Sequence, residues 1–149
     1  MRIDGLVETP TTVDYSVWST LPRTSETVGF HCVLGWSVSD VAWGGVRPAD
    51  LLALAKPLPA GRFVRFSSES GEYSDTLSMA QLTDGYSLLA ESLDGKPLPP
   101  VHGGRLRLVM PTQLGYKSVQ FVRRTDVVDH QEKGYWEESG YAVDAPAKP

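Results

Sequence analysis

Short runs of alternating apolar and polar residues, separated by prolines and glycines, extend along most of this chain. The clearest alternation, over 62–67, predicts a strand with one buried face. Comparable β-rich runs predict further strands over 2–7, 11–15, 26–33, 42–46, 87–93, 106–110 and 119–128. Because eleven prolines and fourteen glycines interrupt the chain, each element is expected to be short. The pattern therefore predicts an α+β fold in which strands dominate.

Helical patterns are few. Pro48 and the leucine-rich stretch 49–55 predict the clearest helix, because proline favours a first helical turn and the leucines recur at helical spacing. Shorter helical turns are expected just before Pro22 and over 78–82. The polar stretches between strands predict loops, over 68–76 and 96–104.

Length and charge narrow the class of protein. The 149 residues fit a single domain, which we expect to span 1–142, followed by a disordered tail over 143–149. A net charge of −4 and scattered basic residues argue against a nucleic-acid-binding surface. No apolar stretch approaches the roughly 18 residues of a membrane span, and the first residues lack a signal-peptide pattern. We therefore expect a cytoplasmic location, or a periplasmic one if the sequence is a mature form without its signal.

The only cysteine, Cys32, follows an expected strand and precedes Gly35, which permits a sharp turn. A single thiol excludes an internal disulfide and a site built from several cysteines. A lone cysteine on a strand is more often a small buried apolar residue than a reactive group. A soft thiolate can also complete the coordination of a metal that a cofactor carries. His31 and Trp36 would then offer polar or stacking groups beside it, and Cys32 alone leaves both interpretations open.

A second group of candidate residues lies within 98–120. Arg105 and Arg107 share one face of a predicted strand, and the stretch Gly-Tyr-Lys-Ser at 115–118 combines a cation, a hydroxyl and backbone amides. This combination suits an anion such as phosphate. A solvated sheet face beside a loop explains the same composition. The polar stretch 67–75 could likewise hydrogen-bond a ligand or simply be solvated.

Several motifs recur in a fixed order along the chain. They include IDGLV at 3–7, HCVLGWS at 31–37, WGGV at 43–46, VRFSS at 64–68, LPPVHGGRLRLV at 98–109, GYKS at 115–118 and GYWE at 134–137. With this order and spacing, the chain resembles the oxidoreductase molybdopterin-binding domain of the sulfite oxidase superfamily over about residues 2–141. The resemblance is to short bacterial members and to the catalytic subunit of periplasmic methionine sulfoxide reductases.

The resemblance implies a sulfite-oxidase-type fold holding one molybdopterin and its molybdenum per chain, with Cys32 as a further sulfur ligand of the metal. It also implies cofactor-binding roles for Ser68, His102, Arg107, Tyr116, Lys117, Ser118, Val119 and Gln120. Because they lie close in sequence to the ligand or to these loops, the candidate catalytic residues beside Cys32 are His31, Trp36, Tyr73 and Asp75.

The implied reaction is two-electron oxygen-atom transfer on a small sulfur or nitrogen oxide, with a separate protein as electron donor or acceptor. Two positions depart from the family pattern: Leu34 replaces a frequent glutamate, and Gln120 replaces a frequent basic residue. The sequence as given has no counterpart of an N-terminal segment that supplies cofactor contacts in relatives, so one side of the pocket is expected to be open or closed by a partner. A non-catalytic cofactor-binding or interaction module acting through a partner is the alternative, and a β-rich ligand-binding domain with a core cysteine is a third.

Overall fold

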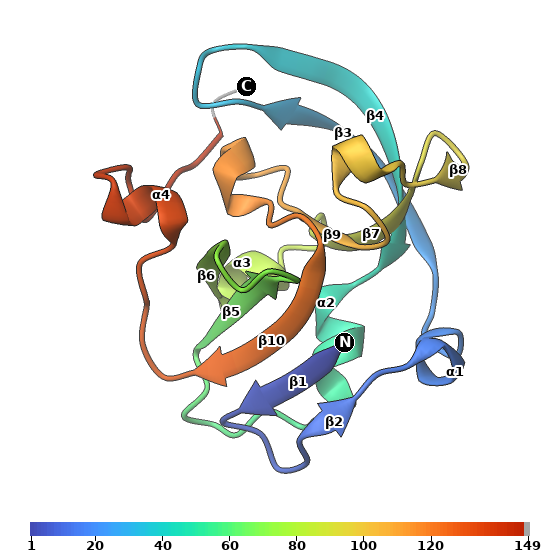
Figure 1. Ribbon diagram of the computed structural model, residues 1–149, viewed down its shortest axis with the longest axis vertical. Coiled ribbons are helices and arrows are strands. Elements are labelled where there is room, and N and C mark those ends of the chain that lie inside the picture. The colour runs from blue at the N-terminus through green and yellow to red at the C-terminus, as the bar shows by residue number, and fades with distance from the viewer. Residues whose placement is uncertain (148–149) are drawn as a thin grey trace.

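The computed structural model describes residues 1–147, which form two sheets packed on a common core (Figure 1). The first sheet has the strand order β2-β1-β10-β5-β6. Its strands are β1 (Arg2–Gly5), β2 (Thr11–Thr12), β5 (Phe63–Ser68), β6 (Ser74–Ser78) and β10 (Val122–Val128). Strands β1 and β10 pair in parallel although they come from opposite ends of the chain, whereas the other pairs are antiparallel.

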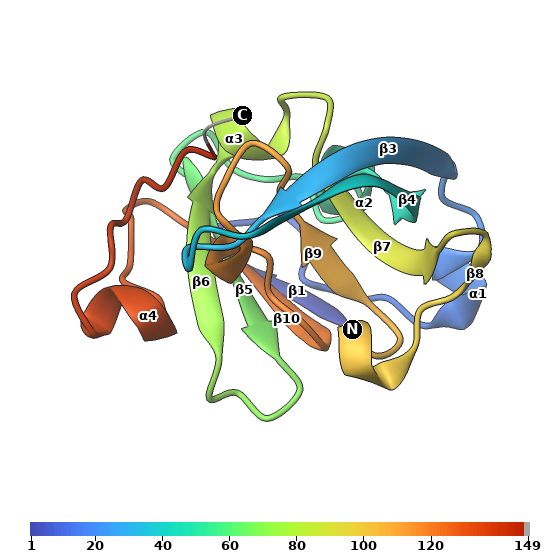
Figure 2. The ribbon, with the colours of Figure 1, turned by 90° about the horizontal axis from the view of Figure 1, so that it is seen from above.

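The second sheet is antiparallel and has the order β3-β4-β7-β8, with β9 also paired to β7 (Figure 2). Its strands are β3 (Thr24–His31), β4 (Ser37–Val46), β7 (Leu88–Leu93), β8 (Lys96–Pro97) and β9 (Arg107–Val109). The apolar faces of both sheets meet in one cluster that includes Ile3, Phe66 and Leu77 from the first sheet and Leu89 and Leu108 from the second. This burial is the main favourable term holding the sheets together.

Short helices close the ends of the two sheets. They are α1 (Tyr15–Trp18), α2 (Pro48–Ala53), α3 (Met79–Leu82) and α4 (Tyr135–Glu138), with 3₁₀ turns η1 (Pro100–His102) and η2 (Gly115–Lys117). Helix α2 begins at Pro48 as predicted and buries Leu51 and Leu52 in the core. Asp14 caps α1 by accepting a hydrogen bond from the Val17 amide.

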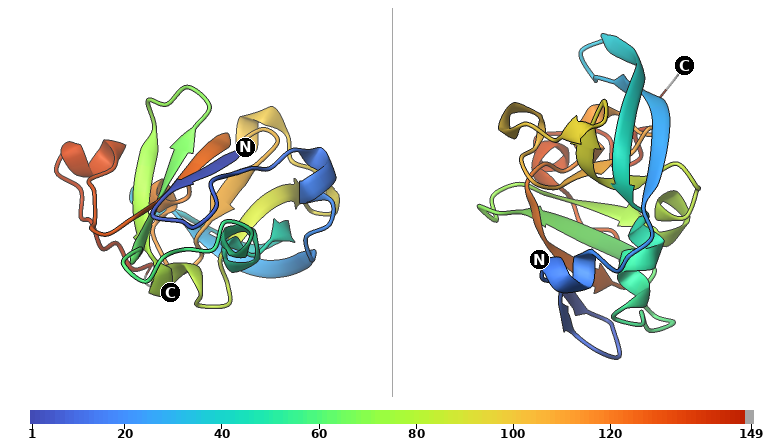
Figure 3. Two further views of the ribbon diagram at one scale, coloured as in Figure 1. Left: turned by 90° about the horizontal axis from the view of Figure 1, so that it is seen from below. Right: turned by 90° about the vertical axis from the view of Figure 1, so that its right-hand side faces the viewer.

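The strand-dominated α+β fold expected from the sequence is the fold observed, but several elements differ from the prediction, β4 and β6 most clearly. Strand β4 begins at Ser37 rather than near residue 42, so β3 and β4 form a long hairpin that projects from the rest of the chain (Figure 3). Strand β6 occupies part of the stretch predicted as a loop. Its first residues are polar yet buried, because Asp75 pairs with a buried lysine and Ser74 accepts a hydrogen bond from Arg65. A polarity pattern cannot reveal such partners.

Part of the expected disordered tail is docked on the fold. Gln113 and Pro146 form an isolated antiparallel bridge, and the Leu114 amide donates to the carbonyl of Ala145 at 2.7 Å. Ala145 itself is buried. The disordered tail predicted over 143–149 therefore differs from the structure for 143–147, while 148–149 lie outside the described residues.

Candidate cofactor site

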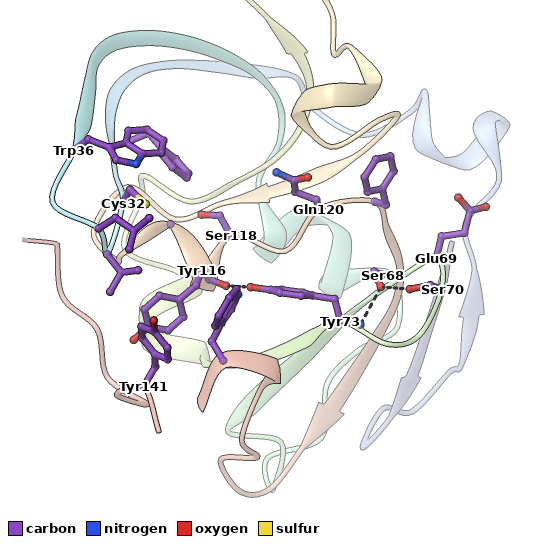
Figure 4. A pocket seen from close by; sticks show the side chains of 16 residues that line it. Cys32, Trp36, Ser68, Glu69, Ser70, Tyr73, Tyr116, Ser118, Gln120 and Tyr141 are labelled. Atoms are coloured by element: carbon purple, nitrogen blue, oxygen red, sulfur yellow. Dashed lines mark hydrogen bonds between the residues drawn. The ribbon is translucent and has the colours of Figure 1, made fainter. Parts of the chain in front are cut away.

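A cleft of about 880 Å³ opens where four segments of the chain converge (Figure 4). Its walls come from the tip of the β3–β4 hairpin, the β5–β6 turn, the segment from η2 to β10, and the stretch that includes α4. Most of its lining is apolar or aromatic. The volume lies in the range of sites that enclose a small molecule or cofactor, roughly 300 to 1,000 Å³.

Cys32 lies in a tight turn at the hairpin tip, on the cleft wall. Its amide donates to the Trp36 carbonyl at 2.9 Å, and the Gly35 amide donates to the Cys32 carbonyl at 3.1 Å. Gly35 has a φ of +88°, a left-handed conformation that glycine adopts without strain. The sharp turn predicted at Gly35 is therefore present, and it holds the half-buried, free thiol at the cleft.

Trp36 shares the cleft wall with Cys32, but His31 does not. The indole of Trp36 is 51% exposed, and its ring centroid lies 6.1 Å from that of Phe30. The His31 side chain instead bonds Ser37, with 2.8 Å between Nδ1 and Oγ. Of the two candidates beside the cysteine, only Trp36 is placed to contact a ligand in the cleft.

The β5–β6 turn contributes hydroxyl groups to the opposite wall. Ser68 Oγ lies 3.1 Å from Ser70 Oγ and accepts a bond of 3.3 Å from the Tyr73 amide. The Tyr73 hydroxyl donates to the Tyr116 carbonyl at 2.6 Å, and burial raises the pKa of Tyr73 above its usual value. Tyr73 thus stays protonated at neutral pH and ties this turn to η2 (Figure 4).

Residues alternate in direction along 116–120, from within η2 toward β10. Tyr116, Ser118 and Gln120 line the cleft, whereas Lys117 and Val119 point into the interior and are fully buried. A side chain at Gly115 would overlap the ring of Phe30, so glycine is needed for η2 to approach β3. Of the five consecutive residues 116–120 for which the resemblance implies cofactor binding, three therefore face the cleft.

Lys117 forms a buried ion cluster with Asp75 and Glu137. Its Nζ donates to Asp75 Oδ1 at 2.5 Å, to Glu137, and to the Thr76 carbonyl at 3.3 Å. Burial raises the pKa of Asp75 to about 7 against the opposing effect of Lys117. Neither Lys117 nor Asp75 lines the cleft. Sequence reasoning missed Glu137, although the GYWE motif at 134–137 contains it.

Arg107 is also buried, at 4% exposure, but lacks an anionic partner within residues 1–147. Its guanidinium lies 5.5 Å from the Phe30 ring centroid and 5.1 Å from that of Trp43. Nη1 donates to the His102 carbonyl at 2.9 Å, while Nε has no hydrogen-bond partner in the described part of the chain. Burial lowers the pKa of Arg107 to about 10, so it remains a cation at neutral pH. His102 contributes this carbonyl only, and its side chain is exposed outside the cleft lining.

A comparison with protein families matches residues 1–136 to the oxidoreductase molybdopterin binding domain. The chain belongs to this family. The resemblance seen in the motifs is thereby confirmed, and with it the oxidoreductase class and molybdopterin carrying molybdenum as the family's cofactor.

Three curated relatives from bacteria are similar over nearly the whole chain. The uncharacterized oxidoreductase YuiH of Bacillus subtilis is 32% identical over 95% of this chain and 71% of its own length. The putative protein-methionine-sulfoxide reductase subunit YedZ1 of Azospira oryzae is 30% identical over 95% of this chain and 53% of its own. The protein-methionine-sulfoxide reductase catalytic subunit MsrP of Campylobacter jejuni is 28% identical over 91% of this chain and 50% of its own. The chain thus spans about half the length of the last two.

The fold also matches a solved structure. The crystal structure of the sulfane dehydrogenase SoxCD from Paracoccus pantotrophus superposes with a TM-score of 0.79 at 26% identity. The match covers 91% of this chain and 38% of that one, and it confirms the sulfite-oxidase-type fold. Within residues 1–147 no helix is long and apolar enough to cross a membrane, and the cytoplasmic location stays a prediction.

The cleft of this family member fits a molybdopterin. The Cys32 thiol is a soft donor on the wall, and Ser68 and Ser118 add hydroxyl groups. Behind Phe30, the buried Arg107 guanidinium has no anionic partner among the described residues, so its positive charge would favour an anionic group of a ligand in the cleft. The cleft therefore offers a soft thiol donor, polar contacts and a nearby cation.

The structure sorts the predicted site residues into two groups. Those that line the cleft are Cys32, Trp36, Ser68, Tyr73, Tyr116, Ser118 and Gln120, and those that do not are His31, Asp75, His102, Arg107, Lys117 and Val119. Arg107 nevertheless contacts Phe30 of the wall, and Asp75 and Lys117 sit behind it in the ion cluster.

Proposed function

We propose that this chain reduces a neutral sulfoxide by two-electron oxygen-atom transfer, with the Cys32 thiolate as a ligand of molybdenum in molybdopterin. The names of the Azospira and Campylobacter relatives, which refer to protein-methionine-sulfoxide reductases, support a sulfoxide as substrate. The balanced reaction converts a sulfoxide, two electrons and two protons into a sulfide and water.

The charge of the cleft is the observation that carries this choice. Among the described residues, Glu69 is the one charged side chain in the lining, and it is acidic. An oxyanion such as sulfite would meet an apolar wall and a like charge, which disfavours binding. A sulfoxide is neutral and carries alkyl groups, which the aromatic lining accommodates through apolar burial and sulfur–aromatic contacts. Trp36, Tyr116 and Trp136 supply such rings.

Each residue of the site has a distinct role in this proposal. Bound in the cleft, the cofactor would supply the two-electron oxygen-atom-transfer chemistry. Cys32 would hold the metal and tune it through a soft, electron-rich sulfur. Ser68 and Ser118 would orient the ring system through hydrogen bonds, and Arg107 would offset the negative charge of the bound group. Gln120, a neutral side chain, lines the same part of the cleft.

Electrons must reach the site from another protein. The motifs of the sequence include no haem or flavin signature, and two relatives are named as subunits, which supports the expected separate electron donor. A donor would approach the open face of the cleft, where the hairpin tip is exposed.

The test uses the full chain purified from a host that makes molybdopterin. We expect about one molybdenum per chain and reduction of methionine sulfoxide by a reduced viologen dye, with sulfite oxidation at least tenfold slower at equal substrate concentration. Cys32→Ser should lose the reduction. Faster turnover of sulfite would contradict the charge argument. A chain without molybdenum, whose Cys32 is freely alkylated, would support the non-catalytic module instead.

A further inference from the structure

We propose that Lys117 is a positioning residue that, through Asp75 and Glu137, anchors residues 134–142 against the cleft. We call residues 134–142 the C-terminal arm. Lys117 would then shape the cleft wall from behind, whereas the family resemblance implied direct binding of the cofactor. This role does not depend on which substrate the cleft takes.

The donors of Lys117 are fully used inside the protein. An ammonium group has three N–H donors, and those of Lys117 meet Asp75, Glu137 and the Thr76 carbonyl. The side chains of Lys117 and Glu137 are 0% exposed and that of Asp75 is 2% exposed. Turning Lys117 toward the cleft would leave two buried carboxylates without a cation, which is strongly unfavourable.

Glu137 connects this cluster to the backbone of the arm. One of its carboxylate oxygens accepts from Lys117, and the other accepts from the Gly134 amide at 2.7 Å. A side chain at Gly134 would overlap the backbone of Ser74 and the carboxyl group of Asp75, so glycine lets the arm lie directly on β6. The cluster therefore joins β6, η2 and α4 at one buried point.

The arm supplies part of the cleft wall. Trp136 and Tyr141 line the cleft, and their rings pack edge to face with centroids 5.4 Å apart. Tyr135 stacks on Tyr73 at 5.5 Å, and the Tyr116 hydroxyl donates to the Ala142 carbonyl at 2.6 Å. These aromatic side chains of the arm are between 36% and 50% exposed. Because such half-exposed contacts are weak, the buried Glu137 is the main side-chain attachment within 134–142, while the chain beyond the arm is held separately at Ala145 and Pro146.

The experiment separates an anchor from a cofactor ligand. Lys117→Met, Glu137→Ala and Glu137→Gln are made in the full chain, with molybdopterin supplied by the host. Glu132→Gln is the matched control, because Glu132 forms a partly exposed ion pair with Arg65 just before the arm. Each protein is treated with chymotrypsin under native conditions, the cleavage sites are identified by mass spectrometry, and molybdenum per chain is measured.

We expect Lys117→Met and Glu137→Ala to accelerate cleavage within 134–142 at least tenfold and to lower molybdenum content to a similar extent. Glu137→Gln keeps one acceptor oxygen and replaces the other with a donor NH2 group, so it can accept from Lys117 or from the Gly134 amide but not from both as two separate oxygens do. Its cleavage rate should lie between those of the unaltered chain and Glu137→Ala, whereas Glu132→Gln should stay within twofold of the unaltered chain. Loss of molybdenum in Lys117→Met but not in Glu137→Ala would make Lys117 a cofactor ligand and overturn the proposal. Equal acceleration of cleavage throughout the chain would overturn it as well.

Hydrogen–deuterium exchange on the unaltered chain tests the anchor without any substitution. An anchored arm requires slower exchange in 134–142 than in the exposed hairpin tip, 33–36. Equal or faster exchange in the arm would contradict the proposal. Failure of the sulfoxide assay would leave these outcomes unaffected, since none of them measures turnover.

Discussion

Two buried cations on neighbouring segments of this fold have opposite surroundings. Lys117 contacts two carboxylates and a backbone carbonyl, so its charge is neutralised within the protein. Arg107 lies between two aromatic rings, makes one hydrogen bond to a carbonyl, and leaves its Nε unpartnered. The first arrangement is complete, whereas the second has capacity for an anion.

This difference separates a structural charge from a binding charge. Burying a charged group is costly unless it gains partners. Lys117 has those partners in the folded chain, so its removal should destabilise the protein itself. Arg107 has no anionic partner among residues 1–147, so the free-energy cost of burying its charge is best offset when an anionic ligand binds. Substitutions at the two positions should therefore separate stability from cofactor retention.

The largest effect is expected from Lys117→Met. Methionine keeps the length of the side chain but leaves Asp75 and Glu137 buried together without a cation. Breaking a buried pair in this way lowers the free energy of unfolding by about 3 to 5 kcal/mol. Urea unfolding of the cofactor-free chain measures it. Lys56→Met is the control, since Lys56 forms an exposed pair with Glu8, and such pairs contribute about 0 to 1 kcal/mol. An equal loss of unfolding free energy in Lys117→Met and Lys56→Met would contradict the structural role of the Lys117 charge.

A pH effect follows from the same cluster. The pKa of Asp75 is raised from 3.8 to about 7, mainly by burial, so the folded chain holds a proton that the unfolded chain releases above about pH 4. Stability should therefore fall as pH rises from about 4 through 7. We expect a loss on the order of 2 to 3 kcal/mol between pH 5 and pH 8. Asp75→Asn, which cannot titrate, should abolish this part of the pH dependence of urea unfolding. An unchanged pH profile in that variant would mean that Asp75 is ionised throughout.

The same two cations show what a sequence can predict. The strands, the turn at Gly35 and helix α2 follow from local patterns and turn residues, and the structure contains them. Lys117 and Arg107 both follow from the motifs as candidate anion-binding residues. The motifs do not predict that the two residues have different surroundings, because Asp75 and Glu137 are distant from Lys117 in sequence and contact it only in the folded chain. The polar residues around Asp75 also predicted a loop where the structure has strand β6. The partner that allows Asp75 to be buried is distant in sequence, so the residues around Asp75 do not reveal it.

Arg107→Met should alter cofactor retention more than stability. Methionine removes a desolvated charge along with its ring contacts and one hydrogen bond, so the free energy of unfolding of the cofactor-free chain should change by less than about 1 kcal/mol. Molybdenum per chain should fall at least tenfold. Arg105→Met is the matched control, because Arg105 is exposed nearby and should retain the metal. If Arg107→Met lost as much unfolding free energy as Lys117→Met, the charge of Arg107 would stabilise the fold rather than bind the cofactor.

Cys32→Ser should have the smallest effect on stability and a complete effect on the metal site. The thiol is half-buried in a solvent-exposed turn and makes no side-chain hydrogen bond to any described residue, so the free energy of unfolding should change by less than about 0.5 kcal/mol. A hydroxyl is a poor ligand for a soft metal centre, so molybdenum-dependent turnover should disappear. Alkylation of the single thiol, followed by mass spectrometry, tests the site without turnover. Cys32 should react readily in the cofactor-free chain and be protected in the loaded one. Equal reactivity in both forms would show that Cys32 is not a metal ligand and is only a small residue of the hairpin turn.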